Sequence, residues 1–314
     1  METPLQKDLK KNFPVFYKTC LHLQSASPLY KNVFTANERV PVNYQLAEEI
    51  CSDALAMSGS DWSQYTKWLS DLSLINMEFL KLQISLEKSG RYLYSTFKEV
   101  EREVFKKNTD GIEGVKYLRG LYFTQIFWAT HHRMFNFFLT EFVAKTPAEG
   151  TCLEAPCGSG VFLGHFLSRK HRWSGVGVDL SDTAIALARR FFEVKGVSPR
   201  AKLIKEDIND YVGSSSFNAI MCGEFLEHVE DPLEILKKLH KLLVPGGRLF
   251  LTTVAWAAFI DHIYLYKNAG EIRDHIAQSG FTIEKEYIQN IFPRDARRLE
   301  ESGVALNYAA VLTK

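Results

Sequence analysis

Apolar and polar positions follow different periods in the two halves of the chain. In the first half, apolar residues recur at helical spacing over residues 42–57, 62–88, 91–106 and 117–143. Asp61 suits the N-cap of the second run, and Gly90 suits its C-terminal end. From about residue 150, short strand-like runs alternate with helix-like runs. The pattern predicts a helical region over residues 1–113 and an α/β domain over residues 114–314.

The strand-like runs of the second half come in a regular order. The first ends near residue 154 and the second near 179. Later runs cover 202–208, 216–222, 244–253, 282–289 and 305–312, with helices over 233–243 and 269–279 between them. Strands that alternate with helices favour a parallel sheet. The last run is expected to lie antiparallel to its neighbours.

Residues 153–181 carry the most specific signal. The first strand ends in Glu154, a loop with Gly158 and Gly160 follows, and the second strand ends in Asp179. Open α/β sheets bind ligands at the carboxyl ends of their strands. Position 163 is Leu, so the loop lacks the dinucleotide fingerprint, and no Gly-Lys-Ser/Thr phosphate loop is present. A carboxylate before the loop repels phosphate, so a nucleotide-like ligand that carries a cation is predicted.

This segment resembles motif I of the class I S-adenosylmethionine (SAM) methyltransferases, with Pro156 in place of the usual first glycine. Downstream, Glu-His-x-x-Asp-Pro begins at Glu227, and Leu-x-Pro-Gly-Gly-x-Leu begins at Leu243, in the order and spacing of that family. The resemblance covers about residues 115–314. It implies an α/β fold with a seven-stranded, doubly wound, mostly parallel sheet, preceded in this chain by an α-helical N-terminal lid domain.

The resemblance also implies a set of cofactor-binding residues. Glu154 would meet the methionine amino group, Asp179 the ribose hydroxyls and Asp207 the adenine amine. The full set is Glu154, Pro156, Gly158, Gly160, Asp179, Leu180, Asp207, Ile208, Cys222 and Gly223. Of these, Cys222 and Gly223, together with Glu224, would leave the fourth strand beside the sulfonium.

Four residues are candidates for the chemistry. Glu224, His228 and His262 are available as a general base, and Asp261 with His262 could form a carboxylate–imidazole pair. His228 has an alternative role, in which it fixes its loop and caps the next helix. His262 has one as well, in which it bonds a backbone group.

Two aromatic segments are candidate substrate walls. Residues 121–136 are dense in aromatic side chains with His, Arg and Asn among them, and a second such segment follows the fifth strand. Aromatic faces attract a sulfonium by cation–π interaction. The predicted substrate-binding residues are Tyr122, Trp128, His132, Asn136, Trp256 and Tyr264. The alternative is that these aromatics belong to the core, and that the N-terminal helices form a structural or dimerisation domain instead of a lid.

Composition narrows the partners. The net charge of +1 implies no bulk attraction to nucleic acid or to a membrane, and no apolar run reaches about 18 residues. The five cysteines show no C-x-x-C spacing, which indicates neither a disulfide framework nor a metal site. With no signal-peptide pattern after Met1, the cytoplasm is expected. The expected partner is a small-molecule substrate, and a homodimer stays open.

The predicted function is methyl transfer from SAM to O, N or C of a small, natural-product type acceptor in a lid-covered site. No Asn-Pro-Pro-Tyr follows the fourth strand, which argues against the type that methylates nucleic-acid amino groups. Two alternatives stay open. One is a cyclase that consumes SAM, of the azetidine-2-carboxylate synthase type, which releases methylthioadenosine. The other is a non-catalytic SAM-binding or partner protein.

Overall fold

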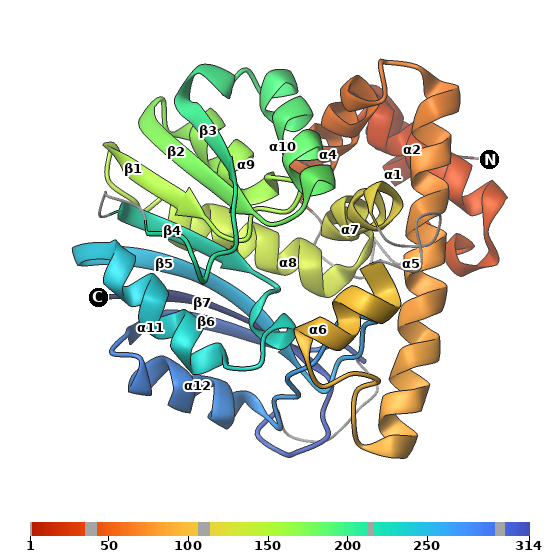
Figure 1. Cartoon of the computed structure of the whole chain (residues 1–314). Helices are drawn as coiled ribbons and strands as arrows, with labels where there is room; N and C mark the ends of the chain where they lie inside the picture. The colour runs from red at the N-terminus through yellow and green to blue at the C-terminus, as the bar shows by residue number, and fades with distance from the viewer. Residues whose placement is uncertain (1, 35–42, 106–113, 213–216, 293–298) are drawn as a thin grey trace.

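A seven-stranded sheet forms the centre of the computed structural model, which describes residues 2–34, 43–105, 114–212, 217–292 and 299–314. The strand order is β3-β2-β1-β4-β5-β7-β6 (Figure 1). The bounds are β1 Glu149–Glu154, β2 Arg172–Asp179, β3 Ala201–Lys205, β4 Phe217–Gly223, β5 Leu243–Ala255, β6 Thr282–Asn290 and β7 Leu306–Thr313. The predicted sheet, with its antiparallel last strand, is confirmed.

The order in which the chain adds strands to the sheet changes side at β1 and β4, which are themselves parallel. Strands β1 to β5 pair in parallel, whereas β7 lies antiparallel between β5 and β6. The chain runs outward from β1 through β2 to β3 and then returns to β4 on the other side of β1. In doubly wound sheets this switch point opens the crevice in which ligands bind. Glu154 and Gly223 end the two strands that flank it.

Each face of the sheet packs on its own helices. On β5, Phe250 packs against Phe138 and Phe162, whose ring centroids lie 4.9 and 5.2 Å away. Its neighbours Leu249 and Leu251 belong to the opposite apolar cluster. Because side chains alternate along a strand, β5 contributes to both cores. The first face carries α8 Ala129–Phe137, the π-helical turn η3 Phe138–Val143, α9 Val161–Arg169 and α10 Asp182–Val194; the second carries α11 Pro232–Leu242 and α12 Ala269–Gln278.

Short sequence signals begin these helices. Asp231 caps α11 by accepting a hydrogen bond from the Glu234 amide, and Pro232 occupies the first turn, where no amide partner is needed. Ser181 caps α10 and Asn268 caps α12 in the same manner. The ends of the helices near the ligand crevice are therefore set by local residues.

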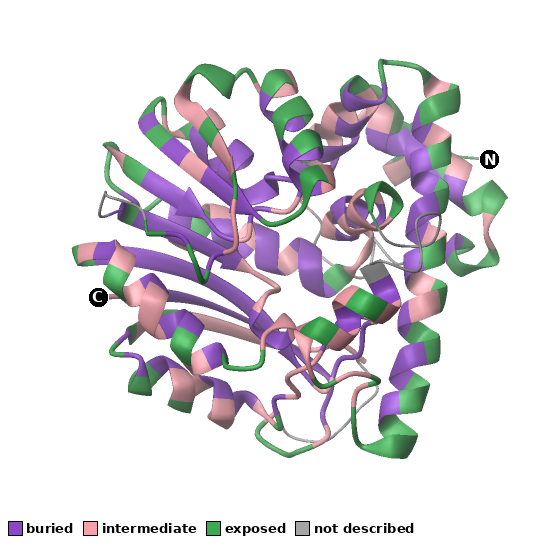
Figure 2. Cartoon of the chain, in the orientation of Figure 1, coloured by how far each residue is buried: buried purple, intermediate pink, exposed green. Residues whose placement is uncertain are grey.

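The N-terminal half is helical, as predicted. Its helices are α1 Pro4–Asn12, α2 Pro14–Ala26, the 3-10 turn η1 Pro28–Tyr30, α4 Tyr44–Met57, α5 Trp62–Ser89 and α6 Phe97–Val100, followed by the π-helical turn η2 Glu101–Phe105. Asp61 caps α5, and Gly90 ends it in the left-handed region at φ 69°. Figure 2 shows a buried side of α5 that faces α7 (Val115–Phe127), while its other side is exposed.

Two predicted helices differ in their bounds. The run over 91–106 is helical only from Phe97, because Thr96 caps a separate short helix. The run over 117–143 breaks at Trp128, which is extended at φ −98° and ψ 115° and turns the chain from α7 into α8. The break matters for the site, because it points the two halves of the aromatic segment in different directions.

The N-terminal helices share their apolar core with the α/β part. One cluster includes Leu46 of α4, Phe123 of α7, Phe162 of α9 and Phe191 of α10. An ionic group reinforces the contact, since Lys195 lies 3.0 Å from Asp53 and Arg169 lies 2.6 Å from Glu49. The predicted boundary after residue 113 adjoins residues 106–113, which lie outside the described part of the chain, and the domain division stays a prediction.

Candidate active site

Glu154 ends β1, and its carboxylate reaches the first turn of α9. Its side chain is 2 % exposed, and its two oxygens accept hydrogen bonds from the amides of Phe162 at 3.3 Å and Leu163 at 3.0 Å. Burial raises the pKa of this carboxyl to about 8, although the two amide hydrogen bonds favour the charged form. The site is therefore one that a cationic group would complete.

The loop after β1 brings its backbone close to open space. Gly158 adopts φ 50°, and a Cβ added there would meet nothing within 4 Å. Gly160 also has positive φ, but a Cβ there would lie 2.7 Å from the Phe192 ring. The two glycines thus have different duties: Gly158 faces the crevice, whereas Gly160 allows the loop to pack on α10.

Asp179 ties this loop to the end of β2. Its Oδ2 accepts from the Gly158 amide at 2.8 Å and its Oδ1 from the Ser181 amide at 2.9 Å. Burial raises its pKa above the ordinary value. Beyond β3, Asp207 accepts from the Asn209 amide at 2.8 Å, and the side chain of Ile208 is buried. Three acids thus follow three neighbouring strands along one edge.

One cavity of about 940 Å³ joins these acids to a second polar group. Helices of the N-terminal half and α7 supply much of its apolar wall, through Phe79, Phe97, Val100, Tyr117, Leu121, Tyr122 and Trp128. Its lining includes seven glutamates and four aspartates, and none of the described residues that line it is Lys or Arg. The cavity is therefore suited to a cation beside an apolar body.

Glu224 begins the second polar group, directly after β4. Its backbone has a positive φ of 48°, and its amide donates to the carbonyl of Thr252 at 2.9 Å and to the Thr252 hydroxyl at 3.0 Å. Burial raises the pKa of its carboxyl to about 7, and its Oε1 has no hydrogen-bond partner among the described residues. The strained backbone holds this carboxylate at the cavity.

Glu227 lies one turn further on and is fully buried. Its Oε2 accepts from the Thr253 hydroxyl at 2.7 Å, while its Oε1 has no partner among the described residues. Burial, followed by the negative charge of Glu224, raises its pKa well above the ordinary value. The two glutamates therefore resist carrying full negative charge together without a nearby cation.

The two histidines differ from the predicted pairing. His228 donates from Nδ1 to the carbonyl of Asp261 at 3.1 Å, and the same nitrogen lies 3.5 Å from the Asp261 carboxylate. His262 donates from its own Nδ1 to the carbonyl of Ala257 at 2.8 Å, and burial lowers its pKa well below the ordinary value. The turn after β5 directs His262 to its own backbone, which is the alternative that the sequence left open, and Asp261 faces His228 instead.

The cavity includes most of the predicted site residues. These are Glu154, Pro156, Gly158, Asp179, Leu180, Asp207, Ile208, Gly223, Glu224, His228, Asp261, His262, Tyr122 and Trp128. Gly160 and Cys222 do not line it. Cys222 faces the opposite apolar cluster with Leu153 and Leu251, because side chains alternate along β4.

Four predicted substrate residues also lie outside the cavity lining. His132 accepts from the Asn43 amide at 3.0 Å, and Asn136 accepts from the Asn43 side chain at 3.0 Å. Tyr264 donates to Glu271 at 2.9 Å, and Trp256 packs beside Leu86. Three of the four are held by hydrogen bonds to other parts of the fold, and the role of all four in substrate binding stays a prediction.

Sequence reasoning missed several lining residues. Glu227 lines the cavity and is the first residue of the Glu-His-x-x-Asp-Pro motif, so the motif is a signal that could have identified it. Tyr117 donates to Asp261 at 3.3 Å across 144 positions of sequence, and Phe79 comes from α5. No local pattern distinguishes these two from core aromatics.

A family model described as a methyltransferase domain matches residues 127–287, which is just over half of the chain. The chain belongs to this methyltransferase family. The predicted class I SAM-dependent family, with SAM as its cofactor, is thereby confirmed. The crevice fits that group, since it combines strand-end acids, open space over Gly158 and no lining Lys or Arg among the described residues.

Relatives of this methyltransferase family cover only parts of the chain. A ubiquinone biosynthesis O-methyltransferase of Pseudomonas paraeruginosa is 31% identical over 104 residues, which is 33% of this chain and 44% of the relative. The Coxiella burnetii protein of the same name is 30% identical over 152 residues, covering 48% and 61%. The chain thus spans about half the length of the curated relatives it matches.

Two solved structures are similar to a little over half of the chain. A SAM-dependent methyltransferase from Thiobacillus denitrificans in complex with S-adenosyl-L-homocysteine gives a TM-score of 0.45 at 16% identity, over 58% of this chain and 90% of that one. A putative sarcosine dimethylglycine methyltransferase from Galdieria sulphuraria gives 0.49 at 11% identity, over 59% and 86%.

Proposed function

We propose that the protein transfers the methyl group of SAM to a small-molecule acceptor that binds in the same cavity, beneath the N-terminal helices. The observation that carries this proposal is the continuity of the cavity. A single space of about 940 Å³ connects the strand-end acids with Glu224, His228 and Asp261. Cofactor and acceptor can therefore meet without crossing open solvent.

At the cofactor end, the acids take the roles that the resemblance implies. Glu154 holds the methionine ammonium, which supplies the cation that its buried carboxylate lacks. Asp179 binds the ribose hydroxyls with the lone pairs left free by its two amide hydrogen bonds. Asp207 and Ile208 hold the adenine, and the Gly158 backbone packs against the methionyl part.

At the other end, three residues can accept the acceptor's proton. Glu224 lines the cavity directly after β4, and its unpartnered oxygen is available. His228 and His262 each donate the Nδ1–H to a carbonyl oxygen. In that tautomer, Nε2 of each ring carries a lone pair that can accept a proton. The transfer forms a bond between the acceptor atom and the methyl carbon, breaks the sulfur–methyl bond and leaves the proton on one of these groups.

The N-terminal helices act as a lid in this proposal. The Gln83 side chain donates to the carbonyl of Trp256 at 2.9 Å and accepts from the Ala258 amide at 3.0 Å. The Phe97 amide donates to Glu230 at 2.7 Å. These contacts connect α5 and α6 to the loops after β5 and β4, above the cavity. Enclosure excludes water and aligns the nucleophile with the methyl group.

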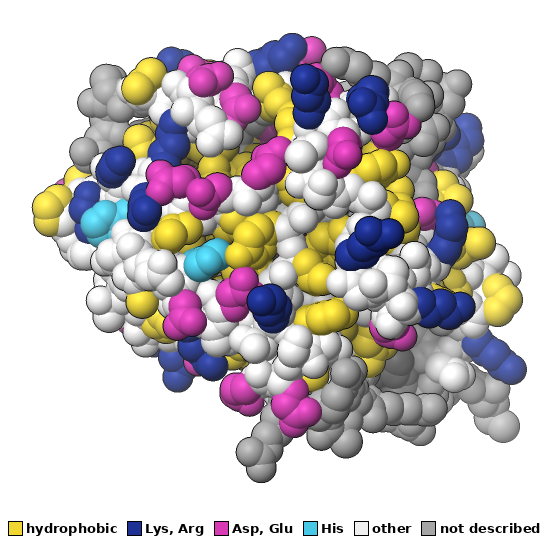
Figure 3. Space-filling view, turned by 60° about the horizontal axis from the view of Figure 1, so that its bottom comes forward, with side chains coloured by type: hydrophobic (Ala, Val, Ile, Leu, Met, Phe, Trp, Pro, Cys, Tyr) yellow, Lys and Arg dark blue, Asp and Glu magenta, His cyan; other side chains and the backbone are white. Residues whose placement is uncertain are grey.

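Helix composition, surface charge and cysteine state bear on the compartment of the protein and on the class of its acceptor. Among the described residues, no helix is long and apolar enough to cross a membrane. Acidic and basic side chains are interspersed on the face in Figure 3, which supports a small-molecule acceptor over nucleic acid. All five cysteines are buried and free, in keeping with a reducing cytoplasm. The homodimer stays a prediction.

The experiment that tests the proposal is product analysis. Purified protein is incubated with SAM alone and with SAM plus a panel of small phenols, amines and enols, and the nucleosides are measured by mass spectrometry. The proposal expects S-adenosylhomocysteine only when an acceptor is present, in equal amount to the methylated product. Methylthioadenosine from SAM alone would replace it with the cyclase alternative. Bound SAM that no tested condition consumes would favour the non-catalytic alternative.

A further inference from the structure

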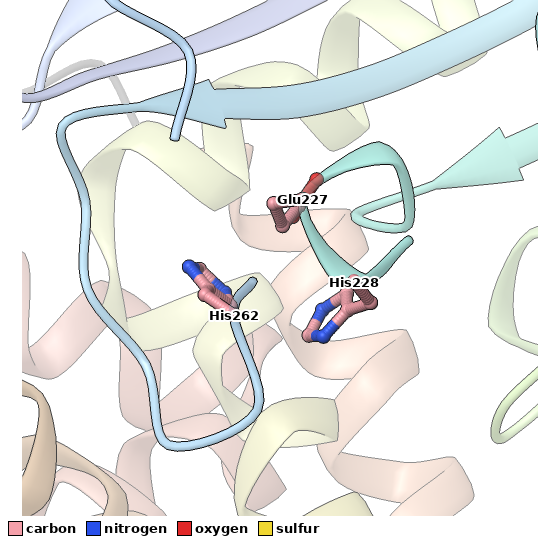
Figure 4. A group of neighbouring side chains, drawn as sticks. All are labelled: Glu227, His228 and His262. Carbon is pink, nitrogen blue, oxygen red and sulfur yellow. The ribbon is translucent and has the colours of Figure 1, made fainter. Parts of the chain in front are cut away.

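Two imidazoles and a carboxylate come together at the acceptor end of the cavity. Glu227 and His228 belong to the 3-10 turn η5 (Leu226–His228), and His262 comes from the loop after β5. Their potential ligand atoms all lie within 4.8 Å of one another (Figure 4). All three residues line the cavity, so a bound group could contact both the protein and an acceptor.

Each of the three side chains makes one hydrogen bond that holds its orientation. His228 and His262 donate from Nδ1 to the carbonyls of Asp261 and Ala257. Glu227 uses Oε2 to accept from Thr253, and its buried Oε1 has no partner among the described residues. Metal-binding histidines commonly donate their second ring N–H to a carbonyl or carboxylate, and ligating carboxylates are held in a similar way.

Charge points to a cation at this place. Three carboxyl groups, those of Glu224, Glu227 and Asp261, line the same cavity as the two histidines, and each has a buried oxygen without a hydrogen-bond partner among the described residues. No described Lys or Arg lines the cavity to neutralise them. Buried carboxylates are paired or bind a metal when they are charged. A bound cation would satisfy these carboxylate oxygens.

A second cluster in the molecule shows the contrast. Glu49, Asp53 and His165 also bring their ligand atoms within 4.8 Å of one another. There, Lys195 lies 3.0 Å from Asp53, and Arg169 lies 2.6 Å from Glu49. The protein's own cations fill that cluster, which has no need of a metal. The Glu227 cluster has the same kinds of ligand, and no Lys or Arg in the described part of the chain lines the cavity beside it.

We propose that Glu227, His228 and His262 bind a divalent transition-metal ion of the Zn²⁺ or Fe²⁺ type, whose open positions take a hydroxyl of the acceptor. Two imidazoles and one carboxylate are a common set for such ions when exchangeable positions remain. An organic ammonium would donate hydrogen bonds to the same carboxylate and nitrogen atoms, and the metal titration below separates the two occupants. Zn–N bonds of about 2.0–2.1 Å place tetrahedral ligand atoms about 3.4 Å apart, which ligand atoms within 4.8 Å of one another can reach by small side-chain rotations.

This inference rests on the proposed function and names its substrate class, a phenol, an enol or another hydroxyl compound. A metal ion lowers the pKa of a bound hydroxyl and fixes its position. In this step the O–H bond breaks, the proton passes to the Glu224 carboxylate, and the oxygen stays on the metal as the nucleophile. The sequence alone predicted no metal site, because its ligands come from two separate segments.

The test uses the full chain, stripped with a chelator and then titrated with Co²⁺ as a spectroscopic probe and with Zn²⁺. We expect one tight site per chain, with visible Co²⁺ bands typical of nitrogen and oxygen ligands. His262→Ala and Glu227→Gln should each weaken binding by about 100-fold or more, which is at least the loss seen when an outer-shell partner is removed. His171→Ala, at an exposed histidine outside the cluster, is the matched control and should bind normally.

Folding and function are separated by two further measurements. Thermal unfolding and SAM affinity show whether each variant is intact, and Glu227→Asp keeps the carboxylate and should retain part of the affinity. Absence of a tight site in intact wild-type protein, or a site unchanged in both ligand variants, would overturn the proposal. Methyl transfer that proceeds fully in chelator would also overturn it while leaving the proposed function in place. Metal binding without any transfer would do the reverse.

Discussion

The two ends of the cavity are built in opposite ways. At the cofactor end, Glu154 and Asp179 accept hydrogen bonds from backbone amides at both of their oxygens. At the acceptor end, Glu224, Glu227 and Asp261 each keep a buried oxygen without a partner among the described residues. The first end is thus preorganised by the fold itself. The second is complete only when something binds, and it is there that we place the chemistry.

The pH dependence of stability sharpens this comparison most. The folded pKa of Glu154 is raised to about 8 from an ordinary 4.5, so the folded protein binds the extra proton. The contribution of this carboxyl to stability is therefore full below about pH 4.5 and is lost as the pH rises toward 8. At about 1.4 kcal/mol per pKa unit, the whole loss amounts to a few kcal/mol.

Urea unfolding of the ligand-free protein across this range measures the slope. Glu154→Gln should flatten it, whereas Glu149→Gln, at the exposed start of the same strand, should not. Saturating SAM should also flatten it, because the ammonium compensates the charged form. A slope that is the same in the Glu154 variant would show that the cofactor end is not charge-strained.

Loss of the ribose contact should come next in size. Asp179→Ala removes a carboxylate that we expect to hold two hydroxyls, and it should weaken SAM binding by about 2–3 kcal/mol. Calorimetry on the folded variant checks this, with the exposed Asp182→Ala at the start of α10 as the control. Unchanged affinity in a folded Asp179 variant would remove this residue from the cofactor site.

The smallest expected effect separates the two glycines of the loop. Alanine at either position meets a positive φ, but only at Gly160 would its Cβ press on Phe192. Gly160→Ala should therefore lower the free energy of unfolding by about 1–2 kcal/mol more than Gly158→Ala. Gly158→Ala should instead act mainly on SAM affinity, because its Cβ enters the open crevice. Equal unfolding energies would contradict the separate duties of these glycines.

The same contrast explains what the sequence could predict. The acids at residues 154, 179 and 207 follow their strands directly, and their hydrogen-bond partners lie within about twenty positions, so a local pattern reveals them. Asp261 instead meets Tyr117 and His228 from distant segments. No local pattern predicts such long-range contacts, so the sequence suggested a pair between Asp261 and its neighbour His262.

The aromatic segment shows a second limit. Its density predicted a substrate wall, and two of its residues, Tyr122 and Trp128, line the cavity. The extended backbone of Trp128 then rotates the following helix, which turns His132 and Asn136 toward Asn43. The sequence predicted one continuous helix here, because no Gly or Pro stands at the break.

We infer that the cofactor end binds SAM and that the acceptor end carries the groups that react, and the Glu224→Gln variant separates these two roles. SAM affinity and turnover are measured on the same variant, by calorimetry and by the rate of S-adenosylhomocysteine formation with a working acceptor. We expect the variant to bind SAM with an affinity within a few-fold of wild type and to turn over more slowly by about 10² or more. Turnover near the wild-type rate, or a loss of SAM affinity that accounts for the whole change, would contradict it.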